Sequence, residues 1–473
     1  MATTYHVSDF LEDRHPYNAK TDFRAQAECD RAKLFDGHGQ PSLEHNIKAL
    51  VDESISTDEK IKTLKYIIGH LTSADTKVQA IKYGLVMSLK WMLDQNMGSA
   101  VDVLGCMAFR SLAIIPAGVF SIYRHQGLPC IINVLAGRLD QPADRTMLQA
   151  REAAANAIQQ LTVGWHAKWL LLGDEIPEGM VGLGVEANGT AEIDTEQSRE
   201  DRKLMGRKVV ETLTHLITSY NADNAISLLI LRSALQSISN LSSESVGLDL
   251  CLICGVLREV DELLQKFANN PTLWIGQGNE QAVEIINLGV TVVWNVCMDP
   301  IGKRKEESLS SLPFSLGKLL LVALNYPLHH LKLKAAIAGA ISTIYIYEDA
   351  KNTCLAPLLK HHEEAKIYGV DETMSYDISS VCVKLMHEGN RMLSMIHAGK
   401  IRDIRSLDTE EIVKENVLAL VKNTVQAIRL ISELPASRPH LVKLIGGDRD
   451  LCLQLYKTTP IEKEMTQACG IKL

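Results

Sequence analysis

The stretch that decides the fold reads Ala225-Ile-Ser-Leu-Leu-Ile-Leu-Arg-Ser-Ala-Leu-Gln-Ser-Ile-Ser-Asn-Leu241. Its apolar side chains recur at the spacing of an α-helix, with polar side chains between them, which predicts a helix buried along one face. Small residues at Ser233, Ala234 and Ser237 allow a neighbouring helix to approach closely. The stretch carries no catalytic group, but the chain repeats its pattern, and the repetition predicts the architecture.

Helices of the same small-and-aliphatic type end at seven further positions. We call the eight positions the anchors: Leu71, Leu112, Leu161, Leu241, Val296, Ile344, Leu385 and Leu434. Successive anchors are 41, 49, 80, 55, 48, 41 and 49 residues apart. Apart from the gap of 80, this period is typical of repeats built from two or three helices.

A glycine follows four of the anchors after 13 to 15 residues, and each of these glycines opens an aliphatic helix. They are Gly84, Gly127, Gly255 and Gly399. Because glycine adopts positive φ without steric cost, each is predicted to form a sharp turn between two helices.

Composition and charge exclude several classes of function. The 473 residues carry a net charge of −8, so no general basic surface is present to attract nucleic acid or anionic lipid. The start of the chain lacks the pattern of a secretory signal, and no apolar run reaches about 18 residues, the length of a membrane span. Ten scattered cysteines suit a reducing compartment. We therefore expect a soluble, non-secreted protein.

The chain divides into a polar N-terminal arm, residues 1–42, and a helical array, residues 43–473. Ser56-Thr-Asp-Glu59 predicts a helix cap ahead of the first anchor. An insertion at 173–202, with five glycines and nine acidic residues against two arginines, explains the gap of 80. Such a segment is predicted to be a surface loop, with helical periodicity resuming at Val209.

Candidate reactive groups have simpler structural explanations. Cys251 and Cys254 form a lone C-x-x-C inside an apolar helix, which favours core packing over zinc. The pair His329-His330 lacks the spacing of a metalloprotease motif, and Gly179 to Gly184 lacks the Lys-Ser/Thr of a phosphate loop. We expect no enzyme activity, no metal, no cofactor and no small-molecule substrate.

A small-residue helix, Asn or Ser before an aliphatic anchor, and a glycine-led aliphatic helix about 14 residues later together resemble the armadillo repeat. The resemblance covers roughly residues 45 to 456. It implies an all-α fold, an armadillo-like right-handed superhelical solenoid of about eight repeats.

The first third also resembles the armadillo-type radial spoke proteins of cilia and flagella. The residues that carry this resemblance are Asp58-Glu-Lys-Ile-Lys-Thr-Leu64, Val78-Gln-Ala-Ile-Lys-Tyr-Gly84 and Gln126-Gly-Leu-Pro-Cys-Ile-Ile-Asn-Val-Leu135. The chain differs from those proteins in its acidic insertion and its longer C-terminal half.

Armadillo proteins bind partners along a concave ridge formed by the third helix of each repeat. By this resemblance, the positions one and five residues before each anchor are predicted to line the ridge. The candidate protein-binding residues are Asn156, Gln160, Gln236, Asn240, Asn295, Lys384 and Arg429. The tryptophan and asparagine ladder of import receptors is missing, because asparagine recurs only at 240 and 295 in its row.

Two functions follow as hypotheses. The first is a non-catalytic scaffold in the ciliary or flagellar axoneme, a cytoskeletal structure, with radial spoke or doublet microtubule components as partners. The second is a soluble cytoplasmic adaptor in signalling or trafficking that binds peptide segments in its groove. Neither involves nucleic acid or a membrane.

Overall fold

The computed structural model describes residues 42–137, 145–173, 196–222, 224–275, 278–298, 311–325, 330–359, 362–371, 374–400 and 409–445. These residues form helices and turns, with no strand among them, so the predicted all-α class is confirmed. The sequence predicted one array from residue 43 onward. The described residues form two compact units, 42–157 and 158–445, and the boundary lies inside one helix, α10 (Arg145–Val163).

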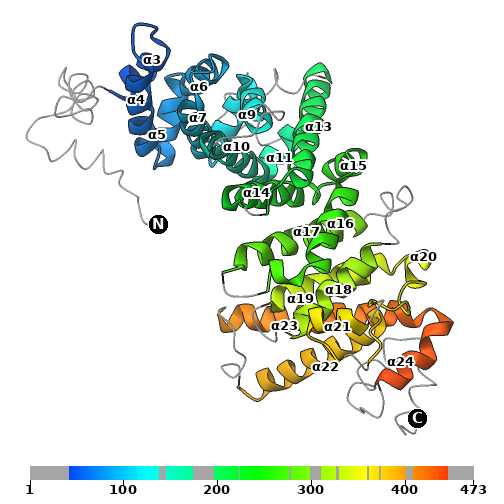
Figure 1. Cartoon of the computed structure of the whole chain (residues 1–473). Coiled ribbons are helices and arrows are strands. Elements are labelled where there is room, and N and C mark those ends of the chain that lie inside the picture. The colour runs from blue at the N-terminus through cyan, green and yellow to red at the C-terminus, as the bar shows by residue number, and fades with distance from the viewer. Residues whose placement is uncertain are drawn as a thin grey trace, which may run out of the picture. The chain divides into compact units, whose positions relative to one another are not determined.

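Unit 1 is built from short helices joined by tight turns (Figure 1). They are α3 (Leu43–Val51), α4 (Thr57–His70), α5 (Ala74–Lys82), α6 (Leu85–Asp94), α7 (Ser99–Leu112), α8 (Pro116–Arg124), α9 (Gly127–Ala136) and the first part of α10 (Arg145–Val163).

Unit 2 contains the remainder of α10 and the helices that follow it in the chain. They are α11 (Trp165–Leu172), α13 (Glu196–Thr218), α14 (Ala225–Leu241), α15 (Ser245–Ile253), α16 (Val256–Asn269), η2 (Pro271–Leu273), α17 (Glu280–Met298), α18 (Leu312–Asn325), α19 (Leu331–Ile344), α20 (Glu348–Lys351), α21 (His362–Tyr368), α22 (Ile378–His397), α23 (Glu410–Ser432), η6 (Pro435–Ser437) and α24 (Arg438–Ile445).

The helices follow the order of an armadillo repeat: a short first helix, then a second and a third helix that pair. In unit 1 the second helices α3, α6 and α9 pack in series, and the third helix α4 packs on α7. In unit 2 the second helices are α13, α16, α18 and α22, and the third helices are α14, α17, α19 and α23, each packed on the next. Six such pairs pack together in the described residues, and α9 and α10 follow one another in the same order. The armadillo-like solenoid of about eight repeats is therefore confirmed as a repeat architecture.

Helix starts follow the predicted capping chemistry. Ser56 and Glu59 form a reciprocal capping box at α4, since the Ser56 side chain accepts from the Glu59 backbone while the Glu59 carboxylate accepts from the Ser56 backbone. Ser42 accepts a hydrogen bond from the backbone of His45 and so begins α3. The Asn224 side chain caps α14 in the same way. These caps satisfy backbone donors that have no partner inside the helix.

The glycine turns are confirmed at two of the first three positions. Gly84 and Gly255 stand before α6 and α16 with φ of 85° and 67°. At Gly127 the prediction is wrong, because Gln126 takes the left-handed conformation and Gly127 is already helical. Glycine is needed at 127 for a different reason: a Cβ there would lie 2.9 Å from the Phe109 ring.

In the last repeats, the structure assigns second and third helices differently from the sequence-based prediction. The anchor Leu385 lies in the middle of α22, and α22 packs on α18, so it belongs to the row of second helices. The following Gly399 has φ of 70° and stands just past the end of α22, and the helix predicted after it, up to Leu407, lies outside the described residues. An aliphatic helix with small residues fits either row, so composition alone did not fix the phase.

The insertion is shorter than predicted. Helix α13 begins at Glu196, thirteen residues before the expected restart at Val209, and Arg202 is buried within it. Gly173 ends α11 in the left-handed conformation. Residues 174–195 and the arm up to residue 41 lie outside the described residues.

Helix α17 is long and apolar enough to cross a membrane by length and composition. In the structure it is packed against α14, α16 and α19, and its β-branched residues from Val290 to Val296 are largely buried in that contact. Its apolarity is therefore explained by its central place among the third helices.

We expect Leu241→Ala to lower the free energy of unfolding by about 2–5 kcal/mol, because Leu241 is fully buried and its loss leaves a cavity. Urea denaturation measures the change. Leu418→Ala on α23 is the matched control, since Leu418 is 56% exposed, and it should cost less than about 0.5 kcal/mol. Equal losses for the two variants would contradict the assignment of Leu241 to the core.

Candidate functional site

The third helices α14 and α17 present a polar face at four-residue spacing. Arg232, Gln236 and Asn240 follow one another along α14, and Thr291 and Asn295 along α17. At one end of this face Arg232 Nε pairs with Glu284 Oε2 at 2.8 Å, and both side chains are nearly half exposed. We call these six residues the ridge. Three of the six, Gln236, Asn240 and Asn295, are among the predicted candidate residues.

The α14 amides of the ridge are bound to their own fold. Gln236 Nε2 donates to Asn240 Oδ1 at 2.9 Å, and Asn240 Nδ2 donates to Thr162 Oγ1 of α10 at 3.1 Å. Asn240 therefore connects two successive third helices through its side chain.

Asn295 makes the equivalent connection one repeat later. Its Nδ2 donates to the Ser239 carbonyl oxygen and to Ser242 Oγ, both at 3.1 Å, across the α17–α14 contact. Asn423 of α23 donates to the Ala335 carbonyl of α19 at 2.9 Å. Asn240 and Asn295 are both half-buried, and their amide hydrogens stabilise the stack.

The other candidate residues are distributed differently. Asn156 and Gln160 are half-buried on α10, and Arg429 is exposed on α23. Lys384 is exposed on the second helix α22, with its ammonium 4.3 Å from the centre of the Tyr376 ring, so it does not join the row of third helices. Their role in binding stays a prediction.

At α19 the row of third helices no longer has an exposed face. Every residue of α19 except Lys332 is buried, and the Trp294 ring of α17 lies against Gly339 so closely that a Cβ there would meet it at 2.5 Å. Lys334 of α19 is fully buried and pairs with Glu388 of α22 at 2.8 Å. A bound segment could therefore follow α14 and α17 but would meet a covered surface at α19.

Sequence reasoning missed Arg232 and Glu284. The signal was present, because Arg232 stands four residues before Gln236 and so shares its helix face. Its partner Glu284 is 52 residues away in the sequence, and only the packing of α14 on α17 brings the two together.

Unit 1 contains a hollow of about 400 Å³ between the ends of α6 and α9 and the starts of α7 and α10. Burial raises the pKa of its Asp102 carboxyl to about 6. Burial also raises the pKa of the Cys130 thiol to about 12, and Cys130 Sγ donates to Asp94 Oδ1 at 3.2 Å. A thiol that stays protonated is a poor nucleophile, so this hollow is not built for cysteine chemistry.

Of the two cysteines in the lone C-x-x-C, Cys251 lies in the core as predicted and Cys254 does so only partly. Cys251 is buried, and burial raises its thiol pKa to about 12, whereas Cys254 ends α15 and is half-buried. In the described part of the chain, no three His, Cys, Asp or Glu side chains come together as a metal site.

No known protein family matches the chain, and no curated protein matches it. Solved structures similar to it include computationally designed armadillo repeat proteins for modular peptide recognition, with 14% identity, a TM-score of 0.43, and coverage of 64% of this chain and 99% of the other. A designed armadillo repeat protein in complex with the peptide (KR)4 has 13% identity and a TM-score of 0.43, covering 64% of this chain and 100% of the other. A chain from a study of the interaction between cadherin and β-catenin has 13% identity and a TM-score of 0.44, covering 91% of this chain and 75% of the other. None of these values identifies a partner of this chain.

We expect Asn295→Ala to lower the free energy of unfolding by about 1–2 kcal/mol, because it removes the two hydrogen bonds that the amide donates across the α17–α14 contact, to the Ser239 carbonyl and the Ser242 hydroxyl. Thr291→Ala is the matched control one turn earlier, because the Thr291 hydroxyl donates only within its own helix, to the Asn287 carbonyl. Urea denaturation compares the two. A control as destabilising as Asn295→Ala would argue against the connecting role of the amide.

We expect Asp102→Asn to stabilise the protein at pH 7 by about 1 kcal/mol, a value reduced because the carboxyl keeps part of its solvent contact. The pKa of Asp102 in the folded protein, about 6, lies above the ordinary value of 3.8 that it has in the unfolded chain. Between these two pH values the folded protein therefore binds more protons than the unfolded chain. Stability contributed by this group therefore falls as pH rises from about 4 to about 6. Urea denaturation at pH 4 and pH 7 should show a gain for the variant only at pH 7, and an equal effect at both values would contradict the titration.

Proposed function

We propose that the chain is a non-catalytic scaffold that holds other proteins through several faces. The observation that carries this proposal is a recurring exposed aliphatic residue two positions after an anchor: Ile114, Val163, Met298 and Ile346 are each more than half exposed. A structural core gains nothing from these side chains. Repeated exposed apolar residues suit repeated contacts with other proteins.

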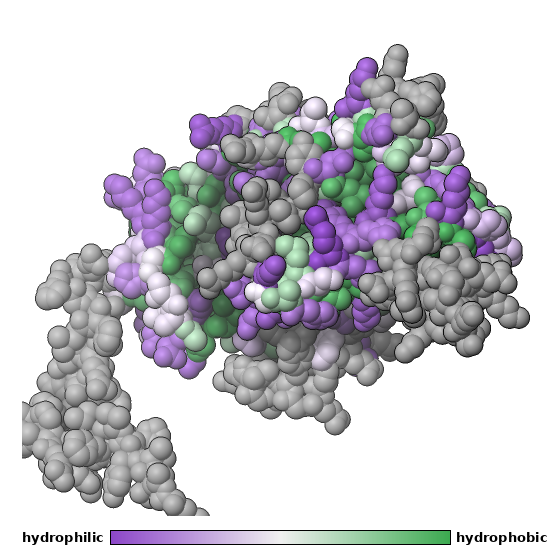
Figure 2. All heavy atoms as spheres, turned by 90° about the horizontal axis from the view of Figure 1, so that it is seen from below, coloured by the Kyte–Doolittle hydropathy of each residue, from purple (hydrophilic) through white to green (hydrophobic). Residues whose placement is uncertain are grey.

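The surface chemistry supports contact on more than one side. Apolar residues reach the face drawn in Figure 2 in several separate areas among hydrophilic ones. The ridge adds polar and charged groups, including the half-exposed pair of Arg232 and Glu284. A single charged or aromatic groove, which an adaptor for one short peptide would use, is less compatible with this distribution.

We further propose that the partners belong to the axoneme of a cilium or flagellum, with radial spoke or doublet microtubule components as the first candidates. This location rests on the resemblance of the first three repeats to armadillo-type radial spoke proteins, through segments such as Val78 to Gly84. The scaffold proposal does not depend on the location.

The test is fractionation of motile ciliated cells that express tagged variants. We expect the wild-type chain in the salt-resistant axonemal fraction. Arg232→Glu places like charges beside Glu284 on the ridge and should reduce recovery at least threefold. Arg207→Glu is the matched control, since Arg207 pairs with Glu211 on the second helix α13 with similar exposure, and it should leave recovery unchanged.

Two outcomes would count against the proposal. Recovery of the wild-type chain wholly in the soluble cytosol would contradict the axonemal location and favour the adaptor. Equal incorporation of the Arg232 and Arg207 variants, with unchanged thermal unfolding, would show that the ridge makes no contact with a partner.

A further inference from the structure

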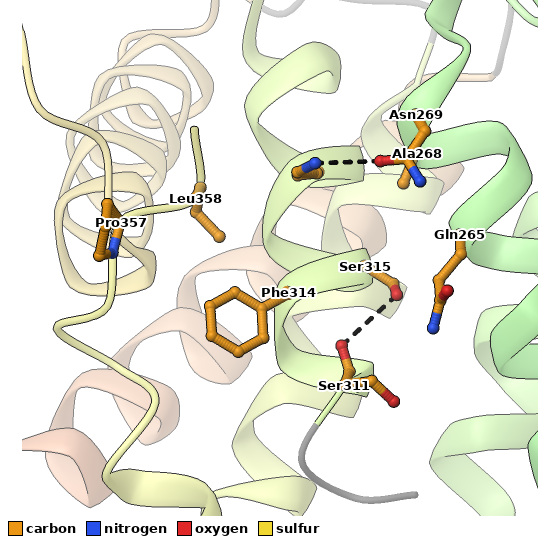
Figure 3. Close-up of a pocket in the computed structure, with 9 residues that line it drawn as sticks. Gln265, Ala268, Asn269, Ser311, Phe314, Ser315, Pro357 and Leu358 are labelled. Carbon is orange, nitrogen blue, oxygen red and sulfur yellow. Dashed lines mark hydrogen bonds between the residues drawn. The ribbon is translucent and has the colours of Figure 1, made fainter. Parts of the chain in front are cut away.

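A pocket of about 360 Å³ lies on the second helices of unit 2, outside the ridge. Helix α16 forms one wall, α18 forms the floor, and the segment Pro357–Leu358 forms the other wall (Figure 3). Figure 3 shows the Phe314 ring on the side of α18 that faces Pro357 and Leu358, and Ser315 on the side that faces Gln265. The pocket therefore has an apolar side and a polar side.

The polar side is fixed by the buried carboxylate of Asp261, which belongs to α16 and lies beside the start of α18. Asp261 of α16 is 4% exposed and accepts hydrogen bonds from Ser315 Oγ and Gln265 Nε2, both at 3.0 Å, and from Ser311 Oγ. Its carboxylate lies beside the first turn of α18, which is the positive end of the helix dipole. Asp261 is thus compensated from within the fold and serves to hold α16 against α18.

Lys318 stands about two turns further along α18, roughly 10 Å from Ser311 by helix geometry. Its ammonium donates to Asn269 Oδ1 at 3.0 Å and lies 5.8 Å from the centre of the Tyr368 ring. Tyr368 is held in place by its own hydroxyl, which donates to the Ala268 carbonyl at 2.9 Å. Within the described residues Lys318 forms no ion pair, so one uncompensated positive charge lines the pocket.

The apolar side consists of Phe314, Leu358 and Pro357, and Ala268 lines the pocket on the opposite wall, α16. Leu358 and Ala268 are buried, whereas Phe314 is half-buried and Pro357 is exposed. The segment at 357–358 is held by a backbone hydrogen bond from Leu358 to the Tyr376 carbonyl at 2.8 Å. The apolar wall is therefore formed before any ligand arrives.

We propose that this pocket is a second docking site for a partner protein, which inserts a segment carrying an acidic side chain next to a large apolar one. The apolar side chain packs against Phe314 and Leu358, and the carboxylate pairs with the Lys318 ammonium. The volume lies near the lower end of the roughly 300–1,000 Å³ typical of ligand pockets, so it holds one or two side chains. The inference shares with the proposed function only the premise that the partner is a protein.

The test starts from a displayed library of random 12-residue peptides selected on the purified full-length chain. Selected peptides should be enriched in Asp or Glu within two positions of Phe, Leu or Trp. Their affinity, measured by fluorescence polarisation, should fall at least tenfold for Lys318→Glu, because an attractive charge pair becomes a repulsive one. Phe314→Ala should weaken binding at least fivefold, because it removes most of the apolar wall.

Lys332→Glu is the matched control, since Lys332 is an exposed lysine on the neighbouring helix α19 and does not line the pocket. It should leave the affinity unchanged. Thermal unfolding of all three variants checks folding. Lys318→Glu is the variant that decides, because Lys318 is only half-buried and the hydrogen bond from its ammonium to Asn269 is exposed.

Three results would overturn the proposal. One is a selection that yields no such peptides or yields basic ones. Another is binding that Arg232→Glu weakens and Lys318→Glu does not, which would place peptide binding on the ridge. The third is free 3-phenylpropanoate competing as strongly as the selected peptides, which would indicate a site for small aromatic acids. None of the three bears on whether the chain is recovered with axonemes.

Discussion

The structure depends on one constraint: the third helices of unit 2 are buried against their neighbours in the same row. Helix α19 shows the constraint in its strictest form, because contact with α17 and α23 leaves only Lys332 exposed. Such contact requires small residues, and Gly339 under the Trp294 ring is the clearest case. A single repeat would expose most of this apolar surface, so the stability of each repeat comes from its neighbours.

The same constraint explains why the asparagines of the ridge are poor predictors of a binding site. Closely stacked helices leave buried polar groups near the contact, and those groups must find hydrogen-bond partners. Asn240 and Asn295 supply donors to Thr162 and to the Ser239 carbonyl, so their amide hydrogens are used by the fold. Groups that project beyond the stack, such as Arg232 and Glu284, remain available to a partner.

The sequence predicted those features that depend on residues close together along the chain. The Ser56–Glu59 capping box, the left-handed Gly84 and Gly255, and the buried Leu241 were all readable from local patterns. What failed depended on three-dimensional contacts. Leu385 has the composition of an anchor but packs as a second helix, and Gly127 is needed for its approach to Phe109 rather than for a turn. The pocket brings Asp261 together with Ser311 and Ser315, residues 50 and 54 positions away, and no local pattern encodes that distance.

The ridge and the pocket lie on different rows of helices in unit 2, and this separation bears on how the unit holds partners. Arg232 and Thr291 belong to third helices, whereas Lys318 and Phe314 belong to a second helix, and buried residues such as Leu264 and Ile285 lie in the contact between the two rows. A close-packed core of this kind has little freedom to rearrange. Occupation of one site should therefore alter the other little, and two segments of one partner could engage both. Linked engagement raises the overall affinity without any new contact, provided that the link between the segments can span the two sites. Weak individual contacts, such as a single half-exposed arginine or a pocket for one or two side chains, are sufficient for a scaffold that works in this way.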